Sequence, residues 1–182
     1  MFYRELLGEA DRQIVFLKVQ NVESLGACTG IVSNNPPWDA MKVGARISFL
    51  EGMLKAVKEA EESGDVVKYK NVYRDFYGYL RSTWERSVEE LLFCGVIERM
   101  QPEVKTMKLT SVSVDPAAVT AVFTGMTNAS NKITAHDHAA AKNTPLPTYT
   151  QLSKDLEDLK IFVKEQKEKI KASDKNLEHL KK

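Results

Sequence analysis

Hydrophobic residues recur at helical spacing over much of the chain. Two stretches, residues 39–62 and 66–94, each carry one apolar face built from steps of three and four. The first face consists of Val43, Ile47, Leu50, Met53, Leu54 and Val57, and the second of Tyr73, Phe76, Leu80, Trp84, Val88 and Leu91. Gly64 and Asp65 in the short link suit a helix C-terminus and the next N-cap. The pattern predicts two long helices packed antiparallel.

In the second half of the chain, the spacing of the apolar residues changes twice. Residues 104–115, "VKTMKLTSVSVD", roughly alternate apolar and polar positions, which favours a strand. The pair Asp115-Pro116 then suits a helix start, and we expect that helix to end near Thr127. A last helix should begin near residues 147–150. Its apolar positions follow a heptad that Gln166 and Ser173 weaken: Leu156, Leu159, Val163, Ile170, Leu177 and Leu180.

The N-terminal part has the pattern of a helix over residues 2–12, a strand at 14–19 ("IVFLKV") and a long loop rich in Gly, Asn and Pro over 20–37. A single strand leaves the backbone N–H and C=O groups along its edges without hydrogen-bond partners, so residues 14–19 should pair with 104–115 in a small sheet. The predicted fold class is α+β and predominantly α-helical, with a long antiparallel helix pair, a small β-sheet or hairpin and a long C-terminal helix.

This pattern divides the chain into three segments. Residues 1–37 form an N-terminal helix, strand and loop. Residues 38–146 form a helical core that includes the strand at 104–114. Residues 147–182 form a C-terminal amphipathic helix.

Composition narrows the class of protein but not its function. Of 182 residues, 43% are hydrophobic and 28% are charged, which is usual for a folded globular chain, and the net charge of +1 points to no particular partner. Charges within the first ten residues argue against a secretory signal, and no stretch reaches the roughly 20 apolar residues of a membrane helix. Cys28 and Cys94 belong to no CxxC pattern and suit two reduced thiols. We therefore expect a soluble, cytoplasmic protein without a membrane partner.

Candidate chemistry concentrates in "LRSTWERSVEE", residues 80–90, and in His136. Arg81 and Glu85 are four residues apart, so on a helix they share one face. One interpretation is an ordinary surface ion pair. The other adds His136, which could move a proton near neutral pH while Arg81 stabilises charge on a phosphate and Glu85 orients a group or acts as a base. Those three groups together suit cleavage of a phosphodiester without a metal.

Two other kinds of site find little support. The chain contains no GxxxxGK[ST] loop and no GxGxxG turn, so the module by itself does not resemble a nucleotide hydrolase. His136-Asp137-His138 suggests a metal site, but histidines two apart point away from each other on a helix and further ligands at suitable spacing are missing. No metal or other cofactor is expected in this module.

Several segments, in this order, resemble the C-terminal region of large bacterial ABC-type ATPases related to the PrrC and RloC anticodon nucleases of phage defence. They are "FYRELLGEA", "PPWDAMKV", "LRSTWERSVEELLFCGVIER", "VKTMKL", "GMT" and "TAHDHAAAKNTPLP", and they cover nearly the whole chain. The resemblance implies a HEPN-like helical ribonuclease with Arg81, Glu85 and His136 as its catalytic residues. Such enzymes use the RNA 2′-hydroxyl as nucleophile and leave a cyclic phosphate. They usually place an arginine shortly before the histidine, and Lys132 is the local cation here.

The resemblance also implies partners. One is an ABC-type ATPase domain or subunit, and ATP or GTP and Mg²⁺ would act only through that ATPase. The other is RNA, with a tRNA anticodon loop as the substrate. A homodimer is expected as well. Lys132 and Tyr77 are the candidate RNA contacts, although at least two of Tyr73, Tyr77 and Tyr79 should belong to the core.

A function of another class fits the same sequence. The chain could be a non-catalytic C-terminal domain that dimerises an ABC-type ATPase or recruits an effector. The heptad of the last helix supports this interpretation, because an apolar stripe needs a partner in the same chain or in another.

Overall fold

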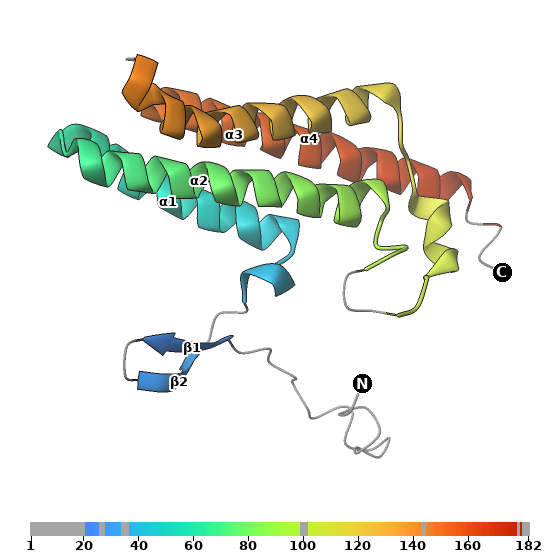
Figure 1. Cartoon of the computed structure of the whole chain (residues 1–182). Helices are drawn as coiled ribbons and strands as arrows, with labels where there is room; N and C mark the ends of the chain where they lie inside the picture. The colour runs from blue at the N-terminus through green and yellow to red at the C-terminus, as the bar shows by residue number, and fades with distance from the viewer. Residues whose placement is uncertain are drawn as a thin grey trace. The chain divides into compact units, whose positions relative to one another are not determined.

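The computed structural model describes residues 21–25, 28–33, 37–98, 102–142, 145–177 and 179, with side chains described at 37–98, 102–133, 145–177 and 179. The chain divides into two compact units, Met1–Met41 and Lys42–Lys182 (Figure 1). The helix predicted at 2–12 and the strand predicted at 14–19 lie outside the described residues.

The first unit contains a β-hairpin where the sequence indicated a loop. Strand β1 (Asn21–Leu25) pairs antiparallel with β2 (Cys28–Ser33), and Asn21 lies opposite Ser33. The register shifts between Glu23 and Leu25. A 3-10 turn, η2 (Trp38–Ala40), follows. The expectation of a continuous loop over 20–37 is therefore wrong for the two strands.

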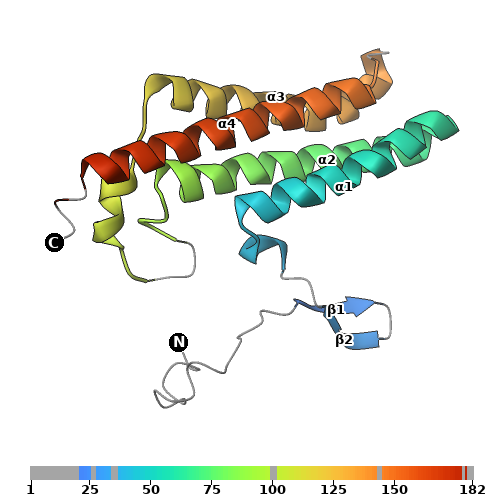
Figure 2. The same ribbon diagram turned by 180° about the vertical axis from the view of Figure 1, so that it is seen from behind.

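The second unit is a bundle of four long helices. They are α1 (Val43–Ser63), α2 (Val66–Ser87), α3 (Pro116–Lys142) and α4 (Tyr149–Asn176). Figures 1 and 2 show that consecutive helices run in opposite directions and lie side by side. The prediction of a predominantly helical protein with a long antiparallel pair, α1 and α2, is confirmed. No helix in the described part of the chain is long and apolar enough to span a membrane.

Local signals set most of the helix ends. Gly64 adopts a left-handed conformation (φ 68°) after α1, and the Asp65 carboxylate accepts hydrogen bonds from the backbone amides at the start of α2. Asp115 Oδ1 accepts a hydrogen bond of 2.8 Å from the Ala118 amide at the start of α3. The Thr148 hydroxyl caps α4. These boundaries agree with those predicted from the sequence.

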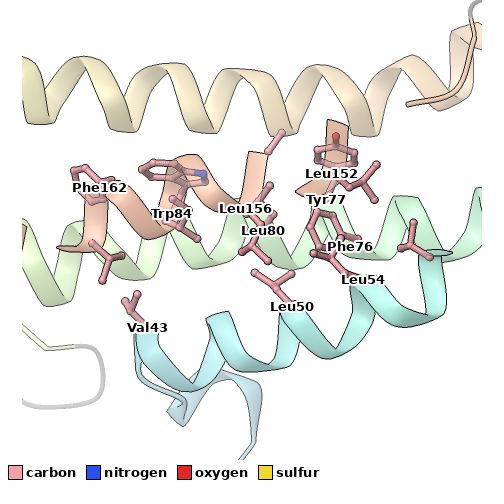
Figure 3. Packing of buried hydrophobic residues seen from close by; sticks show 14 of the residues in the cluster. Val43, Leu50, Leu54, Phe76, Tyr77, Leu80, Trp84, Leu152, Leu156 and Phe162 are labelled. Carbon is pink, nitrogen blue, oxygen red and sulfur yellow. The ribbon is translucent and has the colours of Figure 1, made fainter. Parts of the chain in front are cut away.

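The core of the bundle lies along its axis, where the predicted stripes of α1 and α2 meet α4 (Figure 3). The buried apolar side chains of α4 face the other helices of the same unit, and they are Leu152, Leu156, Leu159, Phe162 and Val163. Trp84 of α2 packs on Phe162 of α4 with ring centroids 5.1 Å apart. The apolar stripe of α4 therefore finds its partner within this chain, and α4 belongs to the same compact unit as α1 to α3.

The predicted strand at 104–114 is absent. Residues Thr106–Ser111 form a 3-10 helix, η4, which packs on α4. The hydroxyls of Thr110 and Ser111 donate to the Asp174 carboxylate at 3.1 and 2.6 Å, and the Ser173 hydroxyl donates to the carbonyl of Thr110 at 2.9 Å. Met107 is 60% exposed, so the apolar and polar alternation does not reflect burial. The strand expected on this side of the predicted sheet is therefore wrong, and residues 14–19 lie outside the described residues.

Helix α3 is longer than predicted. It continues past Thr127 as far as Lys142. Residues 128–142 include no proline or glycine, and several alanines favour the helix. The histidine motif at 136–138 is consequently helical and does not lie in a loop.

Candidate functional site

The C-terminal half of α2 presents the Arg81–Glu85 pair on its outer side. Leu80 and Trp84 are buried, and they fix this rotation of the helix. Arg81 Nη2 lies 3.3 Å from Glu85 Oε1, with the two side chains 48% and 36% exposed. The structure confirms that Arg81 and Glu85 lie on one face of α2 as an ion pair. An exposed pair of this kind contributes only about 0.3–0.5 kcal/mol to stability. Separating the two groups so that either can contact a ligand therefore costs little free energy.

Glu85 also borders an open groove between α2 and α3. The groove has a volume of about 540 Å³, and Val88, the residue that follows α2, also lines it. Its wall on α3 consists of Val122, Phe123, Met126, Thr127, Ser130 and Asn131. Glu85 is the only ionisable side chain among these lining residues. The ion pair therefore stands at the edge of an otherwise uncharged hollow.

The histidine of the predicted triad lies on the helix that forms the other wall. The backbone of His136 belongs to α3, and its side chain lies outside the described part of the structure. At a helical rise of 1.5 Å, its Cα lies about 15 Å along the axis from that of Met126. Because α2 and α3 are antiparallel, Arg81 is one turn nearer than Glu85 to the end of α3 that carries His136. Lys132, half-buried, precedes His136 by one turn on the same side of α3.

The tyrosines of α2 mostly face the core. Tyr73 and Tyr77 are buried, and Tyr79 is half-buried in a T-shaped contact with Phe49. The Tyr77 hydroxyl donates a 2.7 Å hydrogen bond to Asp155 Oδ2. Burial, and then this hydrogen bond, raise the pKa of Tyr77. The expectation that at least two of the three tyrosines belong to the core is confirmed, and Tyr77 offers no accessible ring face to an RNA base.

The sequence analysis missed a change of helix type after α2. Residues Val88–Leu92 form a π-helix, η3. The chain then turns with positive φ at Cys94 (51°) and Gly95 (63°). The helix predicted over residues 66–94 was expected to end here, but no sequence pattern indicated the π-helical turn that precedes this end. π-Helical turns often occur at functional sites, and this one carries Glu89 and Glu90.

A small charged hollow of about 140 Å³ lies beside that turn. It is lined by Lys42, Arg86, Glu89, Glu90, Cys94, Gly95, Glu98 and Lys108. Most of these charges are paired across it. Arg86 Nη1 lies 3.1 Å from Glu89 Oε1, and Glu90 Oε2 accepts a 2.9 Å hydrogen bond from the Val43 amide at the start of α1. The cluster thus fastens the π-turn to α1.

Glu98 and Cys94 complete the hollow without adding a reactive group. Lys105 and Lys108 contact the Glu98 carboxylate at 2.7 and 3.3 Å. The hydrogen bond from Lys105 is the main cause of a lowered pKa at Glu98. The Cys94 thiol is free, and burial followed by the nearby Asp174 carboxylate raises its pKa. A thiol with a raised pKa is a weak nucleophile, so the hollow is best understood as a structural clamp.

The interpretation of the site depends on its geometry. Among the side chains that the structure describes, no group of three or more His, Cys, Asp and Glu residues is arranged to hold a metal ion. No protein family, curated protein or solved structure matches the chain. The catalytic roles expected for Arg81, Glu85 and His136 therefore stay a prediction from the sequence.

Proposed function

We propose that the bundle is a metal-independent endoribonuclease module of an antiphage defence system, with Arg81, Glu85 and His136 as its catalytic residues. The observation that carries the proposal is the exposed Arg81–Glu85 pair at the edge of an open groove. The other wall of that groove is α3, the helix on which Lys132 and His136 lie. An ABC-type ATPase domain or subunit would control the module, and a tRNA anticodon loop would be its substrate.

The chemistry of the three groups gives each a role. The RNA 2′-hydroxyl attacks the adjacent phosphorus, and the bond to the 5′-oxygen breaks. The products are a 2′,3′-cyclic phosphate and a 5′-hydroxyl. His136 would transfer the proton between the two oxygens, and the guanidinium of Arg81 would neutralise charge on the phosphate in the transition state. Glu85, 3.3 Å from that guanidinium, holds it in position.

Lys132 would provide the second cation for the phosphate. It is half-buried on α3, one turn before His136, so its stem is held while its ammonium group can reach the surface. Tyr77, by contrast, is excluded from RNA binding by its burial. Single-stranded RNA loops suit such a site because their phosphates and bases are not enclosed in a duplex.

The test is cleavage of total bacterial tRNA by the purified chain in EDTA, with fragment ends mapped and examined for cyclic phosphate. His136→Ala and Arg81→Ala should abolish cutting. The matched controls are His179→Ala, which changes an exposed histidine elsewhere, and Arg74→Ala, which changes an arginine of α2 that is 52% exposed and paired with Asp75. Both controls should cut as the parent does. Equal loss in a control and its test variant would contradict the assignment.

An interaction domain is the second candidate, and one observation favours it. Exposed large hydrophobic side chains concentrate between residues 93 and 123, and they are Phe93, Ile97, Val104, Met107, Leu109, Val114, Val119 and Phe123. The last helix, which the sequence favoured as the recruiting element, buries its apolar stripe inside the bundle instead. A folded parent that leaves every tRNA intact, also when its ATPase is supplied, would make this the better function.

A further inference from the structure

Another cavity lies between α2, α3 and α4, and it shares no lining residue with the α2–α3 groove. Its volume is about 250 Å³, which is below the roughly 300–1,000 Å³ of pockets that hold drug-sized ligands, so it suits a smaller molecule. Helix α2 contributes Leu80 and Trp84, and α4 contributes Asp155 and Asp158. The residues of α3 that complete the lining are all uncharged, and they are Ala121, Thr124, Gly125, Asn128 and Ala129. The charge of this cavity therefore comes from the two carboxylates of α4.

The Asp155 carboxylate is buried without a counter-charge. Asp155 is 9% exposed, and its two oxygens accept hydrogen bonds from neutral donors, the Tyr77 hydroxyl at 2.7 Å and the Gln151 side-chain amide at 2.8 Å. Within the described part of the chain, neither Asp155 nor Asp158 forms an ion pair. Asp158 follows one turn later and brings a second negative charge to the same cavity. Because a buried charge without an opposite charge is costly, a cation bound in the cavity would be stabilised.

The indole of Trp84 adds a hydrogen-bond donor that the described residues leave unused. Trp84 is only 2% exposed, and its Nε1, blue in Figure 3, donates to no acceptor among those residues. The Nε1 side of the ring faces Gly125, another lining residue, since a Cβ atom added there would lie 2.7 Å from Nε1. Buried indole N–H groups usually have a hydrogen-bond partner. A ligand of this cavity should therefore carry an acceptor for Trp84 as well as a positive charge for Asp155.

We propose that this cavity binds a small organic ammonium ion that carries a hydrogen-bond acceptor, of which an amino alcohol is the simplest example. The ammonium group lies against Asp155 and Asp158, and the oxygen accepts a hydrogen bond from Trp84 Nε1. The carbon chain between them contacts apolar side chains such as Leu80 and Ala129. A metal ion such as Mg²⁺ takes oxygen ligands on all sides, whereas most of this lining is apolar, which favours an organic cation.

The test follows the indole N–H signals of the full chain by NMR during titration with 3-aminopropan-1-ol. Trp38 and Trp84 are the two tryptophans of the sequence, and Trp38, which does not line the cavity, is the internal reference. The Trp84 signal should shift and saturate while the Trp38 signal stays in place.

Two probes of equal length separate the two contributions. Butan-1-amine keeps the ammonium group but lacks the acceptor, so it should bind roughly threefold more weakly or less tightly still. Butan-1-ol keeps the hydroxyl but lacks the charge, so it should give no saturable shift.

Variants of α4 test the carboxylates. Asp158→Asn removes an exposed charge and should weaken binding of 3-aminopropan-1-ol roughly threefold. Asp155→Asn removes the buried charge, while its amide oxygen can still accept from Tyr77, and should weaken binding roughly tenfold or more. The matched control is Glu168→Gln, which removes an exposed charge of α4 about 15 Å along the axis from Asp158 and should bind as the parent does. Circular dichroism verifies that each variant is folded.

Four results would each overturn the proposal. They are a Trp84 signal that does not saturate, an equal shift of the Trp38 signal, butan-1-ol that binds as tightly as 3-aminopropan-1-ol, and an Asp158→Asn variant that binds as the parent does. None of these measurements depends on ribonuclease activity.

Discussion

Gly125 offers the most direct test of how α3 packs on α2. A Cβ atom added there would lie 2.5 Å from Cζ2 and 2.7 Å from Nε1 of Trp84. Ordinary contacts between such atoms are about 3.5–4.0 Å. Trp84 is only 2% exposed and packs on Phe162, so its indole has little room to move (Figure 3). Gly125 therefore allows a close approach of the two helices that alanine would prevent.

The magnitude follows from two opposing contributions. Replacing glycine by alanine inside a helix stabilises it by about 1 kcal/mol when nothing obstructs the methyl group. Overpacking a well-filled core costs about 1–3 kcal/mol, and a rigid, buried indole places Gly125→Ala in the upper half of that range. The net result should be a loss of about 1–2 kcal/mol in the free energy of unfolding.

The chain supplies its own controls for this substitution. Gly52 of α1 and Gly78 of α2 are also helical, and a Cβ at either would meet nothing within 4 Å. Gly52→Ala and Gly78→Ala should each raise the free energy of unfolding, measured in urea, by about 0.5–1 kcal/mol. The Gly125→Ala variant should thus differ from its controls in sign.

A double-mutant cycle identifies the cause. If the indole is the obstacle, Gly125→Ala should cost less in a Trp84→Phe background, because the smaller ring leaves space for the methyl group. The reasoning is refuted if Gly125→Ala stabilises the protein as the controls do, or if its cost is the same with Phe at position 84.

Three further predictions concern polar groups. Tyr77→Phe should lower the free energy of unfolding by about 1–2 kcal/mol in urea titrations, because it leaves the buried Asp155 carboxylate without its 2.7 Å donor. Arg81→Ala should change stability by less than about 0.5 kcal/mol, so that a loss of cleavage would report function; a larger loss in the same titration would disprove this. Asp115→Asn keeps an N-cap but removes the charge that Lys169 contacts at 2.7 Å. The hydrogen bond from Lys169 lowers the pKa of Asp115, so this contribution is present above the ordinary Asp pKa and fades as pH falls below it. The stability gap between parent and Asp115→Asn, followed by thermal unfolding, should therefore close in acid, and a gap independent of pH would contradict it.

Local sequence determined a large part of this fold. The stripes of α1 and α2 recur every three or four residues, so burial of one face follows from the period alone. The helix ends at Gly64, Asp65 and Asp115 follow from the backbone conformation and hydrogen bonding of single residues. The Arg81–Glu85 pair is equally local, since it needs only a helix to bring the two groups together.

Other features depended on contacts between distant segments. Residues 106–111 alternate like a strand, yet they form a 3-10 helix because their hydroxyls bind Asp174, more than 60 residues away in the sequence. Tyr77 looked as available to RNA as Tyr79 until the position of Asp155 on α4 gave its hydroxyl a buried partner. The groove beside Glu85 exists only because α3 packs across α2.

The physical distinction is one of range. Periodicity, capping and neighbouring charges act within one or two helical turns, so the sequence by itself determined α1 and α2, their buried faces and the Arg81–Glu85 pair. Which segments meet depends on the packing of whole helices, whose free energy is the sum of many distant contacts. Only the tertiary structure therefore decided that the apolar side chains of α4 pack inside this bundle and that Trp84 packs directly against Gly125. It also decided that an uncharged face of α3 stays exposed.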